Sequence, residues 1–368
     1  MKDGVERRLF VAATNQNDGK TTSSLGFVTG FSGIAQSVGF IKPVGQRYVS
    51  VDGDQVDEDS FLIQRACKLR CPLSALNPVT VTAEFTRRFL DNPDEAGPVL
   101  ERNITQSFAT VAEGSDLVVI EGSGHAGVGS VFGLSNARVA KLLKAKVVMV
   151  TLGGIGRPVD EVAVNRSLFE SEDVPVVGVV VNKVIPEKLD QTRHYLSKAF
   201  DRLGLPLLGV VPYVPRLSWP TVQQVAEAMN AKVLNGEDRL ANAIADIIIG
   251  AMTPHNAVTH LKDKTLLIVP GDRDDVVLAA VTMDLVRDDI SLAGIVFTGG
   301  LEPHPQTLDL ICRTDIPVLS VDMGTYAAAS RISDILVKIR VTDQEKISLA
   351  TSLVRDYVDL DRLWSLLA

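Results

Sequence analysis

Residues 10–22 read FVAATNQNDGKTT, and this stretch decides the fold that we expect. The apolar residues 9–12 suit a buried β-strand. Gly19-Lys20-Thr21 then carries the core of a phosphate-binding loop, with free backbone N–H groups, a lysine for the β- and γ-phosphates and a hydroxyl for Mg²⁺. Residues 21–33 read as a helix whose positive N-terminal end faces the anion. The stretch therefore predicts a strand, a phosphate-binding loop and a helix that together bind a nucleoside triphosphate.

Three residues, Ala13, Gln16 and Asp18, depart from the usual pattern of such a loop. Ala13 stands where the loop usually opens with glycine, and its side chain limits how closely the backbone approaches a phosphate. Asp18 places a carboxylate beside the phosphate site, where it repels the ligand unless it points to solvent. A Gly-Lys-Thr turn at a helix start with no ligand is the alternative interpretation. The strand before the loop and the helix after it favour the nucleotide.

Composition limits the classes of protein to which the chain can belong. Its 368 residues suggest two domains, and its net charge of −8 argues against non-specific binding to nucleic acid. No segment approaches the roughly 20 apolar residues of a membrane span, and the charged start is unlike a signal peptide. Three cysteines make no disulfide framework. We expect a cytoplasmic protein that binds neither nucleic acid nor a membrane.

Short apolar runs alternate with helical stretches through the first 215 residues. Several of these runs, such as 118–120, 147–150 and 176–181, are apolar at every position. Strands of that kind are buried on both faces, as in a parallel sheet covered by helices. The sequence thus predicts an α/β fold, a doubly wound parallel sheet of the P-loop NTPase type. The expected strands are 9–13, 38–42, 117–121, 146–151, 176–182 and 207–211, and the expected helices are 21–33, 57–69, 98–112, 136–144, 159–171 and 187–203.

A second, smaller α/β domain is expected after a connection. Residues 211–220 hold three prolines and read as an ordered linker. Thr221 is the expected N-cap of the next helix, and residues 343–367 look like two closing helices. The expected boundaries are 1–214, 215–342 and 343–368. Within the second domain we expect strands near 265–269, 293–297 and 317–321, and helices near 221–229, 273–287 and 324–334.

Polar residues follow three of the buried strands of the first domain. Ligands of open α/β sheets gather at the carboxyl ends of the strands, which makes Lys42, Glu121 and Asn182 candidates. Lys20 and Lys42 would neutralise charge during phosphoryl transfer, and Glu121 would hold Mg²⁺ or its water. Asn182 would read the edge of a base. A surface lysine and a carboxylate that caps the next turn are the alternatives for Lys42 and Glu121.

Together these segments resemble the dethiobiotin synthetase family over about residues 8–215. That family has a GTxxxxGKT loop, a Lys-Pro pair, a later Asp, an Glu-Gly-Ala/Ser-Gly segment, a Leu-Gly pair and a late Asn. Cobyrinic acid a,c-diamide synthases share this domain type. The corresponding segments here are Ala13–Thr21, Lys42-Pro43, Asp59, Glu121-Gly122-Ser123-Gly124, Leu152-Gly153 and Asn182.

The resemblance implies ATP and Mg²⁺ as ligands. It assigns Thr21, Asp59 and Glu121 to the metal, with Lys20 on the phosphates. It places Lys42 at the γ-phosphate and an acidic substrate, which makes Lys20 and Lys42 the catalytic candidates, and it places Asn182 at the adenine. The loop residues that it implies for nucleotide contact are Ala13, Asn15, Asn17, Asp18, Gly19, Lys20, Thr21 and Thr22.

The second half resembles the DRTGG domain, which is named after two short motifs. Here they read Pro270-Gly271-Asp272-Arg273 and Thr298-Gly299-Gly300. Both follow expected strands, so they would meet at one rim of a small sheet, with Asp272 capping the next helix. Tight turns and a helix cap without a ligand are the alternative. The candidates for a ligand here are Asp272, Arg273, Thr298, Gly299 and Gly300.

This pair of domains resembles the front part of long-form phosphotransacetylases, in which a separate C-terminal domain transfers the acetyl group. The chain stops at Ala368 without such a domain. We therefore expect a regulatory protein that binds Mg-ATP and senses a metabolite or an enzyme partner through its second domain. An ATP-dependent ligase that activates a carboxylate or carbamate is one alternative, and a scaffold with an empty loop is another. The resemblance to the dimeric dethiobiotin synthetases implies a homo-oligomer.

Overall fold

The computed structural model describes residues 5–51 and 54–368, which form two compact units. The first unit comprises the chain up to Val214 together with Ile339–Ala368, and the second comprises Pro215–Lys338. The C-terminal helices are therefore part of the first unit, whereas the sequence suggested a separate closing segment. Among the described residues, no helix has the length and apolar character needed to cross a membrane.

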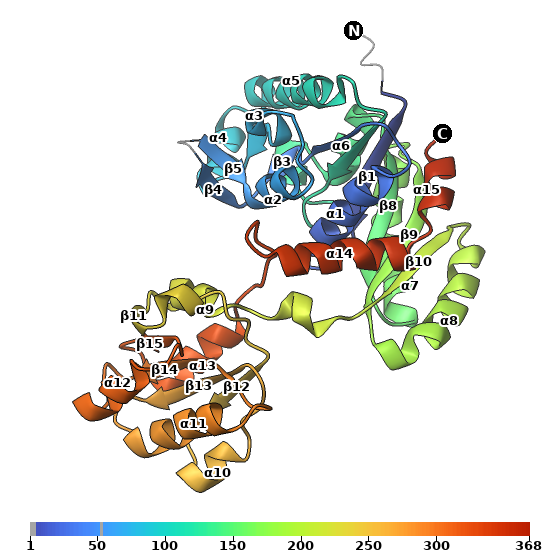
Figure 1. Ribbon diagram of the computed structural model, residues 1–368. Helices are drawn as coiled ribbons and strands as arrows, with labels where there is room; N and C mark the ends of the chain where they lie inside the picture. Colours follow the sequence, from blue (N-terminus) through green and yellow to red (C-terminus); the bar gives the residue numbers. More distant parts are fainter. Residues whose placement is uncertain (1–4, 52–53) are drawn as a thin grey trace. The chain divides into compact units, whose positions relative to one another are not determined.

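The first unit is built on one six-stranded sheet in which all strand pairs are parallel (Figure 1). Its spatial order is β10-β9-β8-β1-β7-β2, so β1 and the loop after it lie near the middle of the sheet. The predicted parallel P-loop sheet is confirmed. The strands are β1 (Arg7–Ala13), β2 (Val38–Ile41), β7 (Leu117–Glu121), β8 (Lys146–Leu152), β9 (Val176–Val184) and β10 (Leu207–Pro212).

Helices cover both faces of this sheet because successive strand residues point to opposite sides. Phe10 and Ala12 of β1 share one core with Phe169 of α7, whereas Leu9 and Val11 are just as buried but lie outside that core. Helix α1 packs against β1 and β7, and α14 packs against α1. The helices around the sheet are α1 (Lys20–Phe31), α5 (Pro93–Ala112), α6 (Asn136–Leu142), α7 (Gly156–Ser171), α8 (Leu189–Arg202), α14 (Gln344–Tyr357) and α15 (Leu360–Leu366).

A subdomain of short elements lies between β2 and α5, where the sequence predicted only a helix over 57–69. That helix ends at Ala66 because Cys67 is its C-cap and Lys68 takes a left-handed φ of 53°. The subdomain places Asp57 and Asp59 at the start of α2. Its elements are β3 (Val44–Gly45), β4 (Tyr48–Val51), β5 (Asp54–Asp57), α2 (Glu58–Ala66), α3 (Leu73–Leu76), β6 (Val79–Thr80) and α4 (Phe85–Asp91).

The second unit is a five-stranded sheet with a core on each face. Its order is β11-β15-β14-β13-β12, with β11 antiparallel to β15 and the other pairs parallel. Thr221 caps α9 in a reciprocal capping box with Gln224, which confirms the predicted N-cap. The elements are α9 (Val222–Met229), β11 (Lys232–Asn235), β12 (Asp246–Ile249), α10 (Pro254–Val258), β13 (Thr265–Pro270), α11 (Asp274–Val286), β14 (Leu292–Thr298), α12 (Pro305–Ile311), β15 (Val318–Ser320) and α13 (Thr325–Ser333).

Candidate functional site

The loop between β1 and α1 has the backbone conformation that a glycine at position 19 permits. Gly19 has a φ of 102° and immediately precedes α1. A Cβ at this position would lie 2.0 Å from Nδ2 of Asn182, at the end of β9. Both the left-handed φ and the close approach exclude a larger residue. The free backbone N–H groups at the N-terminus of α1 therefore follow this glycine directly.

Lys20 lies across the loop that precedes it. Its Nζ donates to the main-chain oxygen of Asn15 at 3.3 Å. Burial lowers the pKa of Lys20 from its ordinary value, while the carboxylates of Glu121 and Asp18 oppose that shift. Within the described part of the chain this half-buried ammonium group bonds one neutral carbonyl, and it is well placed to exchange that bond for an anionic oxygen.

Asp18 does not point to solvent. Its carboxylate therefore stays beside the proposed phosphate site, where the sequence suggested that it would repel the ligand. Its side chain is fully buried, and Oδ2 accepts hydrogen bonds from Oγ1 of Thr14 and from the backbone N of Asn15, both at 2.7 Å. The carboxylate thus stabilises the fold of the loop while it keeps a negative charge next to it. The main-chain oxygen of Asp18 accepts a further bond from Nδ2 of Asn182 at 2.9 Å.

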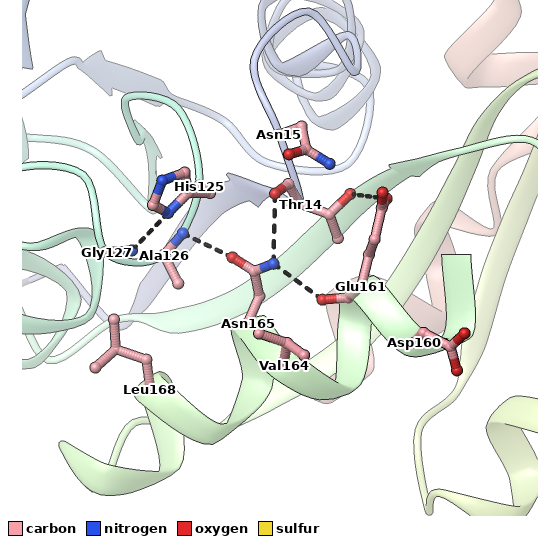
Figure 2. Close-up of a pocket in the computed structure, with 10 residues that line it drawn as sticks. All are labelled: Thr14, Asn15, His125, Ala126, Gly127, Asp160, Glu161, Val164, Asn165 and Leu168. Atoms are coloured by element: carbon pink, nitrogen blue, oxygen red, sulfur yellow. Dashed lines mark hydrogen bonds between the residues drawn. The ribbon is translucent and has the colours of Figure 1, made fainter. Parts of the chain in front are cut away.

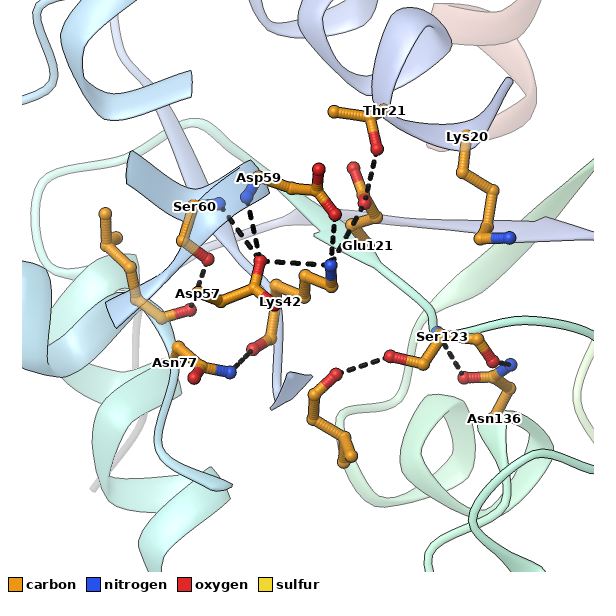
Figure 3. Close-up of polar contacts among 12 residues, drawn as sticks. Lys20, Thr21, Lys42, Asp57, Asp59, Ser60, Asn77, Glu121, Ser123 and Asn136 are labelled. Atoms are coloured by element: carbon orange, nitrogen blue, oxygen red, sulfur yellow. Dashed lines mark hydrogen bonds and ion pairs between the residues drawn. The ribbon is translucent and has the colours of Figure 1, made fainter. Parts of the chain in front are cut away.

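Lys42 lies in a buried cluster of carboxylates (Figure 3). Its Nζ is 3.0 Å from Oδ1 of Asp57 and 3.8 Å from Oε1 of Glu121, and it also pairs with Oδ2 of Asp59. Burial alone would lower the pKa of Lys42, but these carboxylates outweigh it and hold the pKa above its ordinary value. Lys42 is therefore neither a surface lysine nor, in this structure, free to face the loop.

Glu121 connects this cluster to the phosphate-binding loop. Its Oε1 accepts a hydrogen bond from Oγ1 of Thr21 at 3.1 Å. Burial raises the pKa of Glu121 to about 7, and the charges of Asp59 and Asp57 act in the same direction while Lys42 opposes them. The structure thus brings together the three residues assigned to the metal from the sequence. Asp57, which the sequence did not single out, belongs to the same cluster because its Oδ1 caps the N-terminus of α2.

The donor set around Thr21 fits Mg²⁺, which prefers oxygen ligands. One hydroxyl and the carboxylates of Asp59 and Glu121 are present. No three His, Cys, Asp or Glu side chains form a ready-made metal cluster in residues 5–51 and 54–368. A magnesium ion here would therefore complete its coordination with phosphate oxygens and water, as is usual where Mg²⁺ accompanies a nucleotide.

The two motifs of the second unit meet at the ends of neighbouring strands, since Pro270 of β13 is in register with Thr298 of β14. A Cβ on Gly271 would lie 1.9 Å from the main-chain oxygen of Leu301, so this glycine allows two segments to cross. Arg273 pairs with Asp275 and also donates to the main-chain oxygen of Met252 at 3.0 Å. Most of these motif residues therefore have structural contacts of their own.

Three further observations concern this second site. The prediction that Asp272 caps the following helix is wrong, because α11 begins at Asp274, after Arg273, and has no side-chain cap. Gly299 and Gly300 have φ values of 82° and 65°, which favour glycine. Oγ1 of Thr298 shares a hydrogen bond of 2.7 Å with Oγ1 of Thr325.

A pocket of about 560 Å³ lies beside the phosphate-binding loop (Figure 2). Its polar lining includes Asn15, His125 and Asp160, and Oε2 of Glu161 lies 3.2 Å from Oγ1 of Thr14. Apart from Asn15 of the loop, no lining residue of this pocket was predicted from the sequence, because the residues come from three separated segments. The remaining lining residues are Ala126, Gly127, Val164, Asn165 and Leu168.

Comparison with known families agrees with this architecture. Residues 7–221 match the AAA domain family AAA_26, more than half of the chain. The chain belongs to the AAA_26 family. Residues 224–335 match the DRTGG domain, which confirms the predicted order of a P-loop domain followed by a DRTGG domain.

The similar curated proteins are phosphate acetyltransferases. That of Pseudomonas putida is 30% identical over 364 residues, which cover 95% of this chain and 50% of that protein. The phosphate acetyltransferase of Nitrosomonas europaea is 27% identical over 360 residues, which cover 95% of this chain and 50% of that protein. The chain thus spans about half the length of the curated relatives that it matches. The predicted resemblance to phosphotransacetylases is confirmed.

Likeness to solved structures is weaker. The cell division protein MinD of Aquifex aeolicus is 16% identical, with a TM-score of 0.35 over 57% of this chain and 84% of that one. A second structure comprises the CBS and DRTGG domains of the regulatory region of Clostridium perfringens pyrophosphatase, complexed with the activator diadenosine tetraphosphate. It is 18% identical, with a TM-score of 0.27 over 37% of this chain and 60% of that one.

Proposed function

We propose that the first unit binds Mg-ATP at the loop between β1 and α1, and that the chain has a regulatory role related to phosphate acetyltransferases. The observation that carries the proposal is the hydrogen bond from Oγ1 of Thr21 to Glu121, which joins the loop to the carboxylate cluster. Phosphate and metal sites adjoin one another in P-loop proteins, and this contact would place the two proposed sites side by side.

The residues of the loop would act on the phosphates by binding and orienting them. The N–H groups at the start of α1 would hold phosphate oxygens, and Lys20 would exchange the carbonyl of Asn15 for a phosphate. Thr21, Asp59 and Glu121 would hold Mg²⁺, which neutralises phosphate charge when bound. Asn182 first supports the loop, since its amide already bonds Asp18 and Lys183, and contact with adenine would replace one of these bonds.

The pocket beside the loop favours regulation over a ligase that activates an acidic substrate. Asp160 lines the pocket, and its charge would repel a carboxylate, whereas Glu161 is paired with Arg157 at 2.7 Å. We propose a metabolite or an enzyme partner for the second unit, and a cytoplasmic homo-oligomer as the working state.

Nucleotide binding is tested by thermal and urea unfolding with ATP or ADP, each with and without Mg²⁺. A ligand at a hundredfold excess over Kd stabilises the native state by about 2.7 kcal/mol, so wild type should show this shift and Lys20→Ala should not. Lys198→Ala on α8, an exposed lysine, is the matched control and should behave like wild type. The absence of any shift in wild type, or an equal shift in Lys20→Ala, would contradict the proposal.

The regulatory role is tested separately from binding. The protein is incubated with ATP, bicarbonate and diaminopelargonate, and ADP release is measured. We expect no ADP above background. Rapid release that depends on diaminopelargonate would replace the regulatory role by the ligase.

A further inference from the structure

Lys42 holds the carboxylates that the metal would need. Its Nζ pairs with Asp59 and lies 3.8 Å from Oε1 of Glu121, and these two residues are the carboxylate ligands in the proposed Mg²⁺ site (Figure 3). A third carboxylate, that of Asp57, is 3.0 Å from the same nitrogen. One ammonium group thus faces three carboxylates.

The cluster is closed to water, so its charges act strongly on one another. Lys42 and Asp59 are each 7% exposed, and Asp57 and Glu121 are each 1% exposed. Buried carboxylates without a counter-ion are costly because their charges are neither hydrated nor screened. Lys42 is therefore a buried cation that offsets part of the negative charge of these acidic residues.

The backbone of Lys42 is fixed, which confines any change to its side chain. Its N donates to the main-chain oxygen of Leu76 at 2.8 Å, and its O accepts from Nδ2 of Asn77 at 2.8 Å. On the other side, Oδ1 of Asp57 accepts from the backbone N of Asp59 at 2.9 Å. Both partners start from rigid positions, so the ammonium group either stays among the carboxylates or turns away.

A metal ion on these carboxylates would lie close to the ammonium group of Lys42. The repulsion between the two positive charges would then weaken metal binding while Lys42 stays in the cluster. A polyphosphate would give Lys42 a different anionic partner close by, since Thr21 of the loop already contacts Glu121.

We propose that Lys42 is an internal counter-ion that closes the metal site of the nucleotide-free protein. Free divalent metal is excluded, and the metal enters only together with a polyphosphate that draws Lys42 away from Asp59 and Glu121. This inference rests on the metal part of the proposed function, and it assigns Lys42 a role in the absence of substrate that its sequence motif does not suggest.

The test uses Mn²⁺ in place of Mg²⁺ and measures bound Mn²⁺ by electron paramagnetic resonance without nucleotide. Lys42→Met keeps a side chain of similar length and removes the charge. We expect Lys42→Met to bind one Mn²⁺ per chain more tightly than wild type by about tenfold or more, since one nearby charge is removed from the metal site. Adding Glu121→Gln should abolish the gain. Lys198→Met, an exposed lysine on α8, should match wild type.

A second variant covers the case in which Lys42→Met does not fold. Lys42→Met with Asp57→Asn removes one carboxylate as well, so less uncompensated charge is buried, and Asp57 is not among the proposed ligands. A folded variant of either kind that binds Mn²⁺ no better than wild type would overturn the inference, as would tight Mn²⁺ binding by nucleotide-free wild type.

An arm with ATP separates this failure from that of the proposed function. Wild type should bind Mn²⁺ when ATP is present. If ATP does not bind at all, the proposed function fails, and the nucleotide-free comparison still decides whether Lys42 blocks the metal.

Discussion

The contact between α1 and α14 provides a sharp test of the structure. A Cβ on Gly26 of α1 would lie 2.3 Å from Cβ of Val354 on α14, far inside van der Waals contact. Replacing an exposed helical glycine by alanine stabilises a protein by up to about 1 kcal/mol. At Gly26 the overpacking cost of about 1–3 kcal/mol should exceed that gain. We expect Gly26→Ala to lower the free energy of unfolding by about 1–2 kcal/mol.

A double-mutant cycle makes the prediction specific to this pair. Val354→Ala removes two buried methyl groups, at about 0.8 kcal/mol each before any cavity cost. In Gly26→Ala/Val354→Ala the new methyl enters the emptied space, so the double variant should lose about 1–2 kcal/mol less than the sum of the singles. Gly97→Ala on α5 is the matched control, since a Cβ there meets no atom within 4 Å.

Urea unfolding followed by tryptophan fluorescence measures these values for the first unit alone. The chain has two tryptophans, and Trp364 of α15 lies 5.7 Å from the ring of Phe31 on α1. In a Trp219→Phe background the signal comes from this contact. Strictly additive single effects, or a Gly26→Ala variant as stable as Gly97→Ala, would refute the packing of α14 on α1.

Three further predictions concern the loop and its carboxylates. Gly19→Ala should abolish the ATP-induced thermal shift, because Gly19 has a φ of 102° and a Cβ there would clash with Asn182. Gly133→Ala is the control and should keep the shift, because Gly133 has a φ of 71° but a Cβ there meets no atom within 4 Å. Asp18→Asn should bind ATP more tightly than wild type in calorimetry, because it keeps a hydrogen-bond acceptor and removes a charge. Asp18→Val should lose about 1–3 kcal/mol of stability, because the hydrogen bonds to the loop are lost. Equal ATP affinity of Asp18→Asn and wild type would contradict the role of the Asp18 charge. Burial raises the pKa of Glu121 to about 7 in the folded state, above its unfolded pKa. The protonated side chain therefore contributes to the free energy of unfolding at pH values below the unfolded pKa, and this contribution is lost as the pH rises through about 7. The loss is at most roughly 3 kcal/mol, and urea midpoints of Glu121→Gln should fall less between pH 5 and about 8 than those of wild type.

Local chemistry made β1, the loop and α1 predictable from sequence. A buried apolar strand, a glycine with free N–H groups and the lysine after it are adjacent in the chain, and each is constrained by its own neighbours. The same reasoning located Lys42 and Glu121, because the ends of parallel strands meet at one edge of a sheet.

The remaining features depend on contacts between distant residues. Strands as short as β3 (Val44–Gly45) have no periodicity to detect, and their pairing with β6 is set by tertiary structure. Asp57 belongs to the Lys42 cluster because it caps α2, which the expected helix boundary did not reveal. The orientation of Asp18 depends on the hydroxyl of Thr14 and on the chain turning back on itself.

The closing helices have a practical consequence for dissecting the protein. The chain leaves the first unit at Val214 and re-enters it at Ile339, so the DRTGG unit is tethered at both of its ends (Figure 1). A protease that cuts one tether would not release this unit, because the other tether still joins it to the rest. A fragment truncated before Ile339 would leave α1 without the helices that cover it, and it would misrepresent the nucleotide-binding half.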